Sequence, residues 1–246
     1  MVDRPVVALV TGANRGLGRE TARQLAGKGI TVLLGSRDPQ RGAAVAAEIV
    51  AEGGDAVAVP LDVTDEDSVA AVAAQVRDVW SKLDVLVNNA GAFRPATAVE
   101  TTAAPMRDIF EVNVFGVVTV TRAVLALLAR SPAPRIVNVS STTASLALTS
   151  AGEALPGNAA VRMAYTASKA TLNMLTVQYA RAFQLDPELA RIKINSATPG
   201  YTATDMNQHQ GILSVHDGAR AIVELATLPA DGPTGGFFDD EGPVPW

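Results

Sequence analysis

The stretch "VVALVTGANRGLG", residues 6–18, joins an aliphatic run to a glycine-rich turn. The run has the length and β-branched content of a buried strand, and the residues after the turn predict a helix through about Lys28. Gly12, Gly16 and Gly18 fall at the junction, where glycine lets the backbone approach a ligand and a helix N-terminus offers unpaired N–H groups. The stretch therefore predicts a strand–turn–helix unit that suits a phosphate-bearing ligand.

The glycine spacing leaves an alternative open. It is G-x-x-x-G-x-G rather than the general dinucleotide spacing G-x-G-x-x-G. Short glycine motifs also occur where a turn simply leads into a helix and no ligand binds.

The alternation of strand and helix continues along the whole chain. Ala-rich segments with apolar residues at helical spacing, such as "SVAAVAAQVRDVW" (68–80), separate further short aliphatic runs. These runs are "TVLLGSR" (31–37), "AVAVPLD" (56–62), "LDVLVNNAG" (83–91), "RIVNVSS" (135–141) and "IKINSATPG" (192–200). A last strand is expected around Gly236 to Phe238, before a tail with several Gly and Pro residues. Continuous apolar strands between helices predict an α/β fold, with a parallel sheet covered on both faces, in a single domain over residues 1–246.

Composition excludes several function classes. The 246 residues carry 20 Lys and Arg against 25 Asp and Glu, a net charge of −5 without a basic stripe, so nucleic acid is not expected as a partner. There are no cysteines, and two histidines, His209 and His216, do not complete a structural zinc site, so no metal is expected. Because no apolar run approaches a membrane span and no signal-peptide core is seen, we expect no membrane partner and a cytoplasmic location.

The end of the second expected strand, "LLGSRD" (33–38), bears on cofactor choice. A free ribose 2′-hydroxyl usually meets an acid here, whereas a 2′-phosphate calls for an arginine. Ser36 leaves room, Arg37 supplies a planar cation, and Arg15 in the glycine turn could approach the same phosphate. This favours NADP(H) over NAD(H). Both arginines could instead be solvated surface residues, and Asp38 could neutralise Arg37 or contact a ribose.

Polar or small residues follow the other expected strands as well. They are Asp62–Val63, Asn88–Gly91, Ser140–Ser141 and Pro199–Gly200. Because ligands bind beyond the carboxyl ends of parallel strands, these positions are expected to meet in one crevice. Each has a structural alternative: Asp62 could cap the helix that begins near Asp65, and Asn88 could tie neighbouring loops together.

"AYTASKATL", residues 164–172, places Tyr165 and Lys169 four apart, on one face of a helix. A tyrosine with its ordinary pKa of about 10 is a poor proton-transfer partner at neutral pH unless its phenolate is stabilised, and a nearby ammonium does so. Ser141 could hydrogen-bond a substrate oxygen, and Asn113, in "FEVNVFG", could order water for proton delivery. In isolation, the pair could equally be a surface tyrosine packed on a lysine stem.

Together these motifs resemble those of the short-chain dehydrogenase/reductase family. "TGANRGLG", "NNAG", the Asn of "NVFG", "IVNVSS", "YTASK" and "PGYTATDM" occur in the family's order, and the similarity covers essentially the whole chain. The resemblance implies a three-layer, doubly wound Rossmann sheet of about seven strands in the order 3-2-1-4-5-6-7. It implies the catalytic set Asn113, Ser141, Tyr165 and Lys169, with Tyr165 as general acid/base, Ser141 on the substrate oxygen, Lys169 on the phenol and ribose, and Asn113 supporting the relay. The cofactor residues that it implies are Gly12, Asn14, Arg15, Gly16, Leu17, Gly18, Arg37, Asp62, Val63, Asn89, Ala90, Gly91, Tyr165, Lys169, Pro199, Gly200 and Thr202.

Within the family, "SRDPQRG" (36–42), "LDVLVNNAG" and the ending "PTGGFFDDEGPVPW" (233–246) are most similar to NADPH-dependent carbonyl reductases. This similarity implies hydride transfer from NADPH to a ketone or aldehyde. The expected substrate contacts are Ser141, Phe93, Thr142, Tyr201 and Met206, with Thr143, Met163 and residues 207–214 as further pocket candidates.

Twenty-three residues separate Ser141 from Tyr165, which indicates an insertion at about 147–162 beside a substrate loop at about 201–214. This intermediate insertion leaves open whether the protein is a monomer or a homo-oligomer, because longer insertions in carbonyl reductases cover a surface that other members use to associate. Two other functions are weighed: an epimerase or dehydratase on the same fold, which usually needs a longer chain, and a nucleotide sensor that has lost catalysis.

Overall fold

A computed structural model describes residues 5–155 and 157–246. Its centre is a parallel sheet of seven strands in the order β3-β2-β1-β4-β5-β6-β7. The strands are β1 (Val7–Thr11), β2 (Thr31–Ser36), β3 (Ala56–Pro60), β4 (Val85–Asn88), β5 (Arg135–Val139), β6 (Lys193–Ala197) and β7 (Phe237–Phe238). The α/β class, the parallel sheet and the predicted strand order are thereby confirmed.

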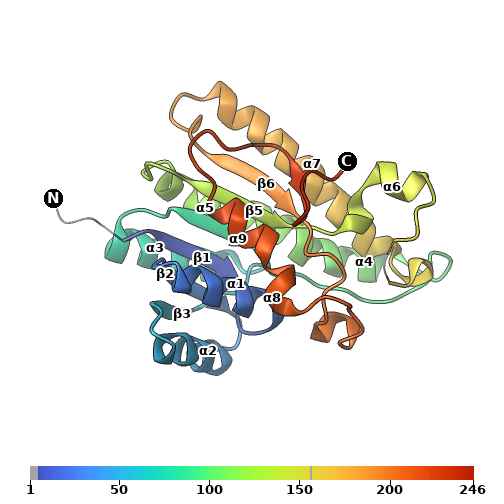
Figure 1. Cartoon of the computed structure of the whole chain (residues 1–246), viewed down its shortest axis with the longest axis horizontal. Helices are drawn as coiled ribbons and strands as arrows, with labels where there is room; N and C mark the ends of the chain where they lie inside the picture. Colours follow the sequence, from blue (N-terminus) through green and yellow to red (C-terminus); the bar gives the residue numbers. More distant parts are fainter. Residues whose placement is uncertain (1–4, 156) are drawn as a thin grey trace.

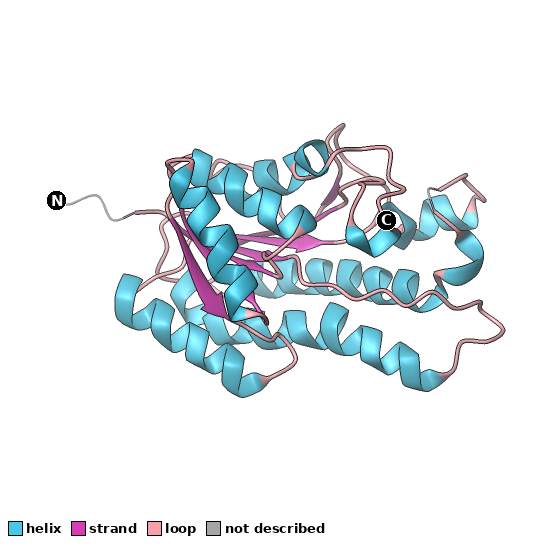
Figure 2. Ribbon diagram, turned by 90° about the horizontal axis from the view of Figure 1, so that it is seen from below, coloured by secondary structure: helices cyan, strands magenta, loops and turns pink. Residues whose placement is uncertain are grey.

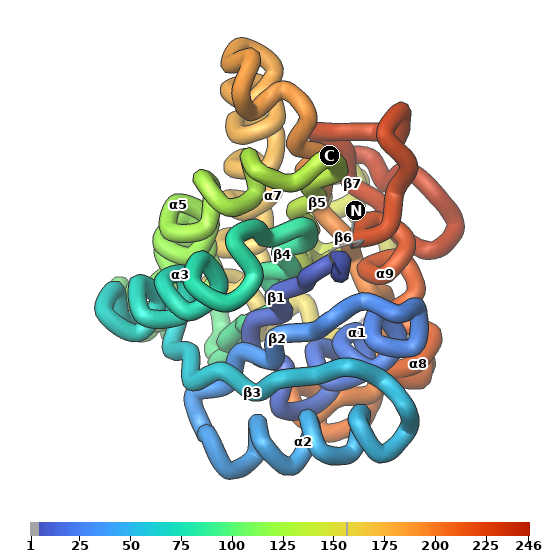
Figure 3. Tube along the Cα trace, turned by 90° about the vertical axis from the view of Figure 1, so that its left-hand side faces the viewer, coloured from blue at the N-terminus to red at the C-terminus, as the bar shows by residue number. Residues whose placement is uncertain are grey.

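Helices cover both faces of this sheet, as Figures 2 and 3 show. They are α1 (Gly16–Gly27), α2 (Pro39–Ala51), α3 (Glu66–Trp80), α4 (Ala103–Phe110), α5 (Gly116–Leu128), α6 (Leu146–Ser150), α7 (Met163–Leu185), α8 (Val215–Gly218) and α9 (Arg220–Ala226). The strands β1, β2 and β4 are buried along their whole length, which explains why they contain almost no polar residues.

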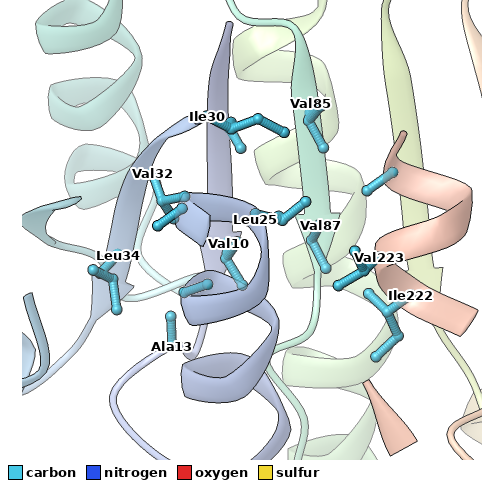
Figure 4. Packing of buried hydrophobic residues seen from close by; sticks show 14 of the residues in the cluster. Val10, Ala13, Leu25, Ile30, Val32, Leu34, Val85, Val87, Ile222 and Val223 are labelled. Carbon is cyan, nitrogen blue, oxygen red and sulfur yellow. The ribbon is translucent and has the colours of Figure 1, made fainter. Parts of the chain in front are cut away.

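The two faces have separate hydrophobic clusters. On one face, Val10, Val32 and Val87 of the sheet pack against Leu25 of α1 and Ile222 of α9 (Figure 4). The other cluster joins the opposite side chains of the same strands to α3, α5 and α7. Because successive side chains in a strand point to opposite faces, each strand supplies both clusters.

Helix caps fix where the helices after β2 and β3 begin. Asp38 accepts hydrogen bonds from the backbone N–H groups of Gln40 and Arg41 and so caps α2. The cap of α3 is Asp65, which accepts from Asp67 N–H, whereas Asp62 accepts from the N–H and hydroxyl of Thr64 one turn earlier. The alternative in which Asp62 caps the helix is therefore wrong, because Asp65 occupies that position.

The segment between β4 and β5 is one long helical stretch with a π turn, Glu111–Phe115, between α4 and α5. Over the described residues, this stretch, Ala103–Leu128, is the one helix long and apolar enough to cross a membrane, by length and composition alone. Half of its most apolar window is buried, and Val120 and Val124 of α5 pack into the second hydrophobic cluster. This is the profile of a core helix.

All strands point toward the end of the molecule where α4 and α6 lie, together with the segment that follows β6 (Figure 1). The carboxyl ends of the parallel strands therefore lie beside α4, α6 and the segment that follows β6. A ligand site is expected at this edge of the sheet.

Candidate active site

Two cavities lie side by side at the carboxyl edge of the sheet. The first has a volume of about 340 Å³ and the second about 360 Å³. Tyr165 borders both, and so do four residues from the glycine turn and the segment after β6: Leu17, Pro199, Thr204 and Met206. A ligand in one cavity can therefore meet a ligand in the other beside the Tyr165 side chain.

Most of the cofactor residues named from the sequence border the first cavity. They are Gly12, Asn14, Arg15, Gly16, Leu17, Gly18, Arg37, Asp62, Val63, Asn89, Ala90, Gly91, Tyr165, Lys169 and Pro199. Gly200 and Thr202 border the second cavity instead, because the chain turns at Gly200 (φ +65°) and the Thr202 hydroxyl bonds back to Pro199 O at 2.7 Å.

Two glycines that border the first cavity let its turn pack tightly against the segment after β4. Gly12 has a φ of +64°, and a Cβ there would lie 3.0 Å from Ala90 Cα. A Cβ on Gly18 would lie 2.4 Å from Asn89 Nδ2 and 2.5 Å from Gly12 O. Side chains at these positions would collide with the segment after β4 and with the turn itself, so the glycines let the turn pack closely against that segment at the border of the cavity.

The N-terminus of α1 opens into the same cavity. Arg15 is its N-cap residue, no described side chain caps its first N–H groups, and the first turn holds no acidic residue. Those N–H groups and the helix dipole suit a pyrophosphate. Together with the glycine cradle, this fits a nicotinamide dinucleotide better than a plain helix-capping turn.

Lys169 is buried next to the backbone of β4 and β5. Its side chain is 4% exposed, and its Nζ donates to Val139 O at 2.7 Å and lies 5.7 Å from the centre of the Tyr165 ring. Burial lowers the Lys169 pKa from 10.5 to about 8. The ammonium therefore persists at neutral pH, close enough to stabilise a phenolate.

Tyr165 meets Ser141 at the boundary of the two cavities. Burial raises the Tyr165 pKa to about 12, and a hydrogen bond from Ser141 acts against that rise. The phenol ring packs edge-on against Phe93, with ring centres 5.4 Å apart. At neutral pH the tyrosine is therefore a proton donor, held in one orientation.

Of the serine pair after β5, Ser141 borders the second cavity, whereas Ser140 is 2% exposed. The Ser140 hydroxyl points to Lys169 O, 3.5 Å away. This geometry favours Ser141 as the serine that meets a substrate, as the sequence analysis expects.

Asn113 lies on the π turn and borders neither cavity. Its Nδ2 donates to Ala92 O and to the Ser168 hydroxyl, and its Oδ1 accepts from Ala92 N–H at 2.7 Å. Gly91 lies between the Asn113 amide and Lys169, since a Cβ there would be 3.6 Å from Asn113 Oδ1 and 3.7 Å from Lys169 Nζ. Asn113 thus anchors the backbone after β4 beside the lysine. Asn88 lies deeper and donates to Asn138 and Thr121.

The second cavity contains most of the expected substrate contacts. Phe93, Ser141, Thr143, Tyr201 and Met206 border it, and so do Asn207, Gln208 and Gln210 of the loop that follows. Thr142 and Met163 do not border it: the Thr142 hydroxyl pairs with that of Thr198 at 2.9 Å.

Several bordering residues escaped the sequence analysis. They are Arg41, Val112, Val139 and Asp205 in the first cavity and Pro95, Gly157, Asn158, Val161 and Arg162 in the second. Two had a readable signal: Arg41 lies in the first turn of the helix that follows Arg37, and Arg162 precedes Tyr165 by three residues. Four residues of the second cavity lie in the insertion at about 147–162: Gly157, Asn158, Val161 and Arg162.

The Lys169 pKa leads to a prediction about the protein without cofactor. Between pH 8 and 10.5 the unfolded chain binds a proton on Lys169 that the folded chain does not, so the free energy of unfolding rises with pH. Tyr165 acts in the opposite direction, but only above its ordinary pKa of 10. When the pH is raised from 8 to 9.5, the free energy of unfolding of the wild type should therefore rise by about 2 kcal/mol relative to that of Lys169→Met, measured by urea unfolding. The exposed Lys28→Met change is the control, and parallel curves for wild type and Lys169→Met would contradict the assignment.

Comparisons with known proteins agree with this geometry. The short chain dehydrogenase family model matches residues 6–212. The chain is 33% identical to (−)-isopiperitenone reductase of Mentha piperita, covering 94% of this chain and 95% of that one. It is also 33% identical to (+)-neomenthol dehydrogenase of Arabidopsis thaliana, with 96% of both chains covered.

A solved structure shares the whole fold. The NADPH-bound carbonyl reductase from chicken fatty liver superposes with a TM-score of 0.85 at 28% identity, covering 99% of this chain and 100% of that one. Each of these proteins is a reductase or dehydrogenase by name, which does not favour the epimerase, dehydratase or sensor alternatives. The chain belongs to the short-chain dehydrogenase family and is a nicotinamide-dependent oxidoreductase that interconverts a small-molecule carbonyl and its alcohol.

Proposed function

We propose that this protein uses NADPH in preference to NADH and reduces the carbonyl of an apolar ketone. The observation that carries the proposal is the position of Tyr165, whose hydroxyl bonds to Ser141 where the two cavities meet, with Lys169 beside it. The names of the relatives that are reductases support the reductive direction.

In this proposal the substrate oxygen lies between the hydroxyl groups of Ser141 and Tyr165. The residues of the first cavity would hold a reduced nicotinamide, whose chemistry would be hydride transfer to the carbonyl carbon. Ser141 donates a hydrogen bond to the oxygen as it gains negative charge, and Tyr165 gives its proton to that oxygen. The Lys169 ammonium stabilises the remaining phenolate, and Asn113 keeps the backbone at Ala92 in place.

The walls of the second cavity support an apolar substrate. Phe93, Pro95, Val161, Tyr201 and Met206 supply carbon surface beside the hydroxyl groups of Ser141 and Thr143. Further polar side chains at its border are Asn158, Arg162, Thr202, Thr204, Asn207, Gln208 and Gln210. A cavity with apolar walls and a few converging polar groups suits a ligand with one reactive carbonyl and a hydrocarbon body.

Arginines support the choice of NADPH. Arg15, Arg37 and Arg41 all border the first cavity. Asp38 is engaged by the α2 N-terminus and by Arg41, whose Nε lies 3.2 Å from its carboxylate, and Arg37 makes no ion pair within the described part of the chain. Arg37 is therefore the cation best placed to receive a 2′-phosphate.

The direct test is a spectrophotometric assay of NADPH and NADH oxidation with ketones, aldehydes and quinones. We expect oxidation of NADPH with apolar ketones, faster than with small polar aldehydes. Tight NADPH binding without turnover on any compound in the panel, or equal rates with NADH, would count against the proposal.

Replacing Arg37 tests the phosphate contact. Arg37→Glu removes a charge-assisted hydrogen bond and adds repulsion, so kcat/KM for NADPH should fall about 100-fold while that for NADH changes little. Arg122→Glu, an exposed residue of α5 with the same change in charge, is the matched control. An unchanged NADPH/NADH ratio in Arg37→Glu would place the phosphate elsewhere.

A further inference from the structure

The side chain of Ser141 has a second hydroxyl group directly against it. Thr143 lies two residues later in a short 3₁₀ turn, Thr142–Ala144, and its Oγ1 is 3.0 Å from Ser141 Oγ. The backbone N–H of Thr143 also donates to Ser141 Oγ, at 3.3 Å. Thr143 is 7% exposed and borders the second cavity, so its hydroxyl group is largely shielded from solvent.

A third hydroxyl group sets the direction of this contact. Thr166, next to Tyr165 on α7, donates its hydroxyl proton to Thr143 Oγ1 at 3.2 Å. A threonine hydroxyl has one proton and two acceptor positions. With the Thr166 proton accepted, the Thr143 proton has Ser141 Oγ as its hydrogen-bond acceptor within residues 5–155 and 157–246.

The same count fixes the proton of Ser141. Its oxygen accepts from the Thr143 hydroxyl and from the Thr143 N–H, which uses both acceptor positions. The Ser141 proton is therefore directed to the remaining partner, the Tyr165 oxygen. Hydroxyl groups that donate to one another in series polarise one another, which strengthens the hydrogen bond donated by the last of them, Ser141.

We propose that Thr143 is a positioning residue for the reduction: the hydrogen bonds from Thr166 to Thr143 and from Thr143 to Ser141 hold the serine as a donor, which faces the Tyr165 oxygen in this structure and would face a substrate oxygen bound between the two hydroxyl groups. This inference rests on the proposed carbonyl reduction at the same site. The turn that carries Thr143 is anchored from the insertion, because the Thr149 hydroxyl donates to Thr143 O at 3.1 Å. Thr143 acts through Ser141 and does not itself exchange a proton with the substrate.

The test compares Thr143→Val, which keeps the shape and removes the hydroxyl, with Thr143→Ser, which keeps the hydroxyl. We expect Thr143→Val to lower kcat about tenfold, with KM and NADPH affinity within twofold of wild type, and Thr143→Ser to recover most of the rate. Thr171→Val, which removes a hydroxyl bonded to Ala167 O on the same helix, should leave kcat unchanged. A kcat of Thr143→Val within twofold of wild type, or no recovery in Thr143→Ser, would overturn the proposal.

A double-mutant cycle separates this role from packing. In a Ser141→Ala background, Thr143→Val should have no further effect, because its action passes through the serine. An equal loss in both backgrounds would mean that Thr143 acts by packing, and it would overturn the proposal.

Should Thr143→Val fail to fold, Thr166→Val removes the hydrogen bond to Thr143, one step earlier in the series of hydroxyl groups. It should lower kcat about threefold, again only where Ser141 is present. If Ser141→Ala alone kept full activity, the proposed function of this site would fail first, so the two failures are distinguishable.

Discussion

Tyr165→Phe is expected to lower kcat for carbonyl reduction about 10³-fold while the affinity for NADPH stays within a few-fold of wild type. The change removes the hydroxyl group that bonds to Ser141 where the two cavities meet, and with it the proton donor. The ring remains, so its edge-on contact with Phe93 and the shape of the site are kept.

The measurement is steady-state turnover together with NADPH binding followed by fluorescence. Tyr179→Phe is the matched control, since Tyr179 lies on the same helix, packs against Phe183 and borders neither cavity. A Tyr165→Phe variant with more than a tenth of the wild-type kcat would show that the proton comes from another group.

Gly18→Ala has the second largest expected effect, on cofactor binding and stability. The added Cβ would meet Asn89 Nδ2 and the backbone at Gly12 and Ala13, at 2.4, 2.5 and 3.0 Å, so the turn or β4 must shift. We expect NADPH affinity to fall more than 30-fold and the free energy of unfolding to fall by about 2 kcal/mol.

Gly27→Ala is the control for Gly18→Ala, because it lies on the same helix, α1, and a Cβ there meets nothing within 4 Å. It should leave cofactor binding unchanged and should be neutral or slightly stabilising, since alanine favours a helix more than glycine does. Equal NADPH affinities for the two variants, measured by isothermal titration, would show that the close packing at Gly18 does not shape the cofactor cavity.

The layered fold could be predicted because its signals are local. The aliphatic strands β1, β2 and β4 are short apolar runs, and the helices between them show apolar residues at helical spacing. The full strand order came from the family resemblance, and the structure confirms it. The π turn at Asn113 was not predicted, because its extra residue has no clear signature in sequence.

By itself the sequence determined the residue types at each strand end and the helical spacing of Tyr165 and Lys169, since neighbours along one helix or turn are placed by local geometry. Only the tertiary structure decided that Tyr165 borders both cavities, that Thr142 turns to Thr198 while Thr143 accepts from Thr166, and that the Asn113 amide holds Ala92. These contacts join segments far apart in the chain. Hydrogen-bond partners of that kind depend on how strands and helices pack, and no local pattern encodes them.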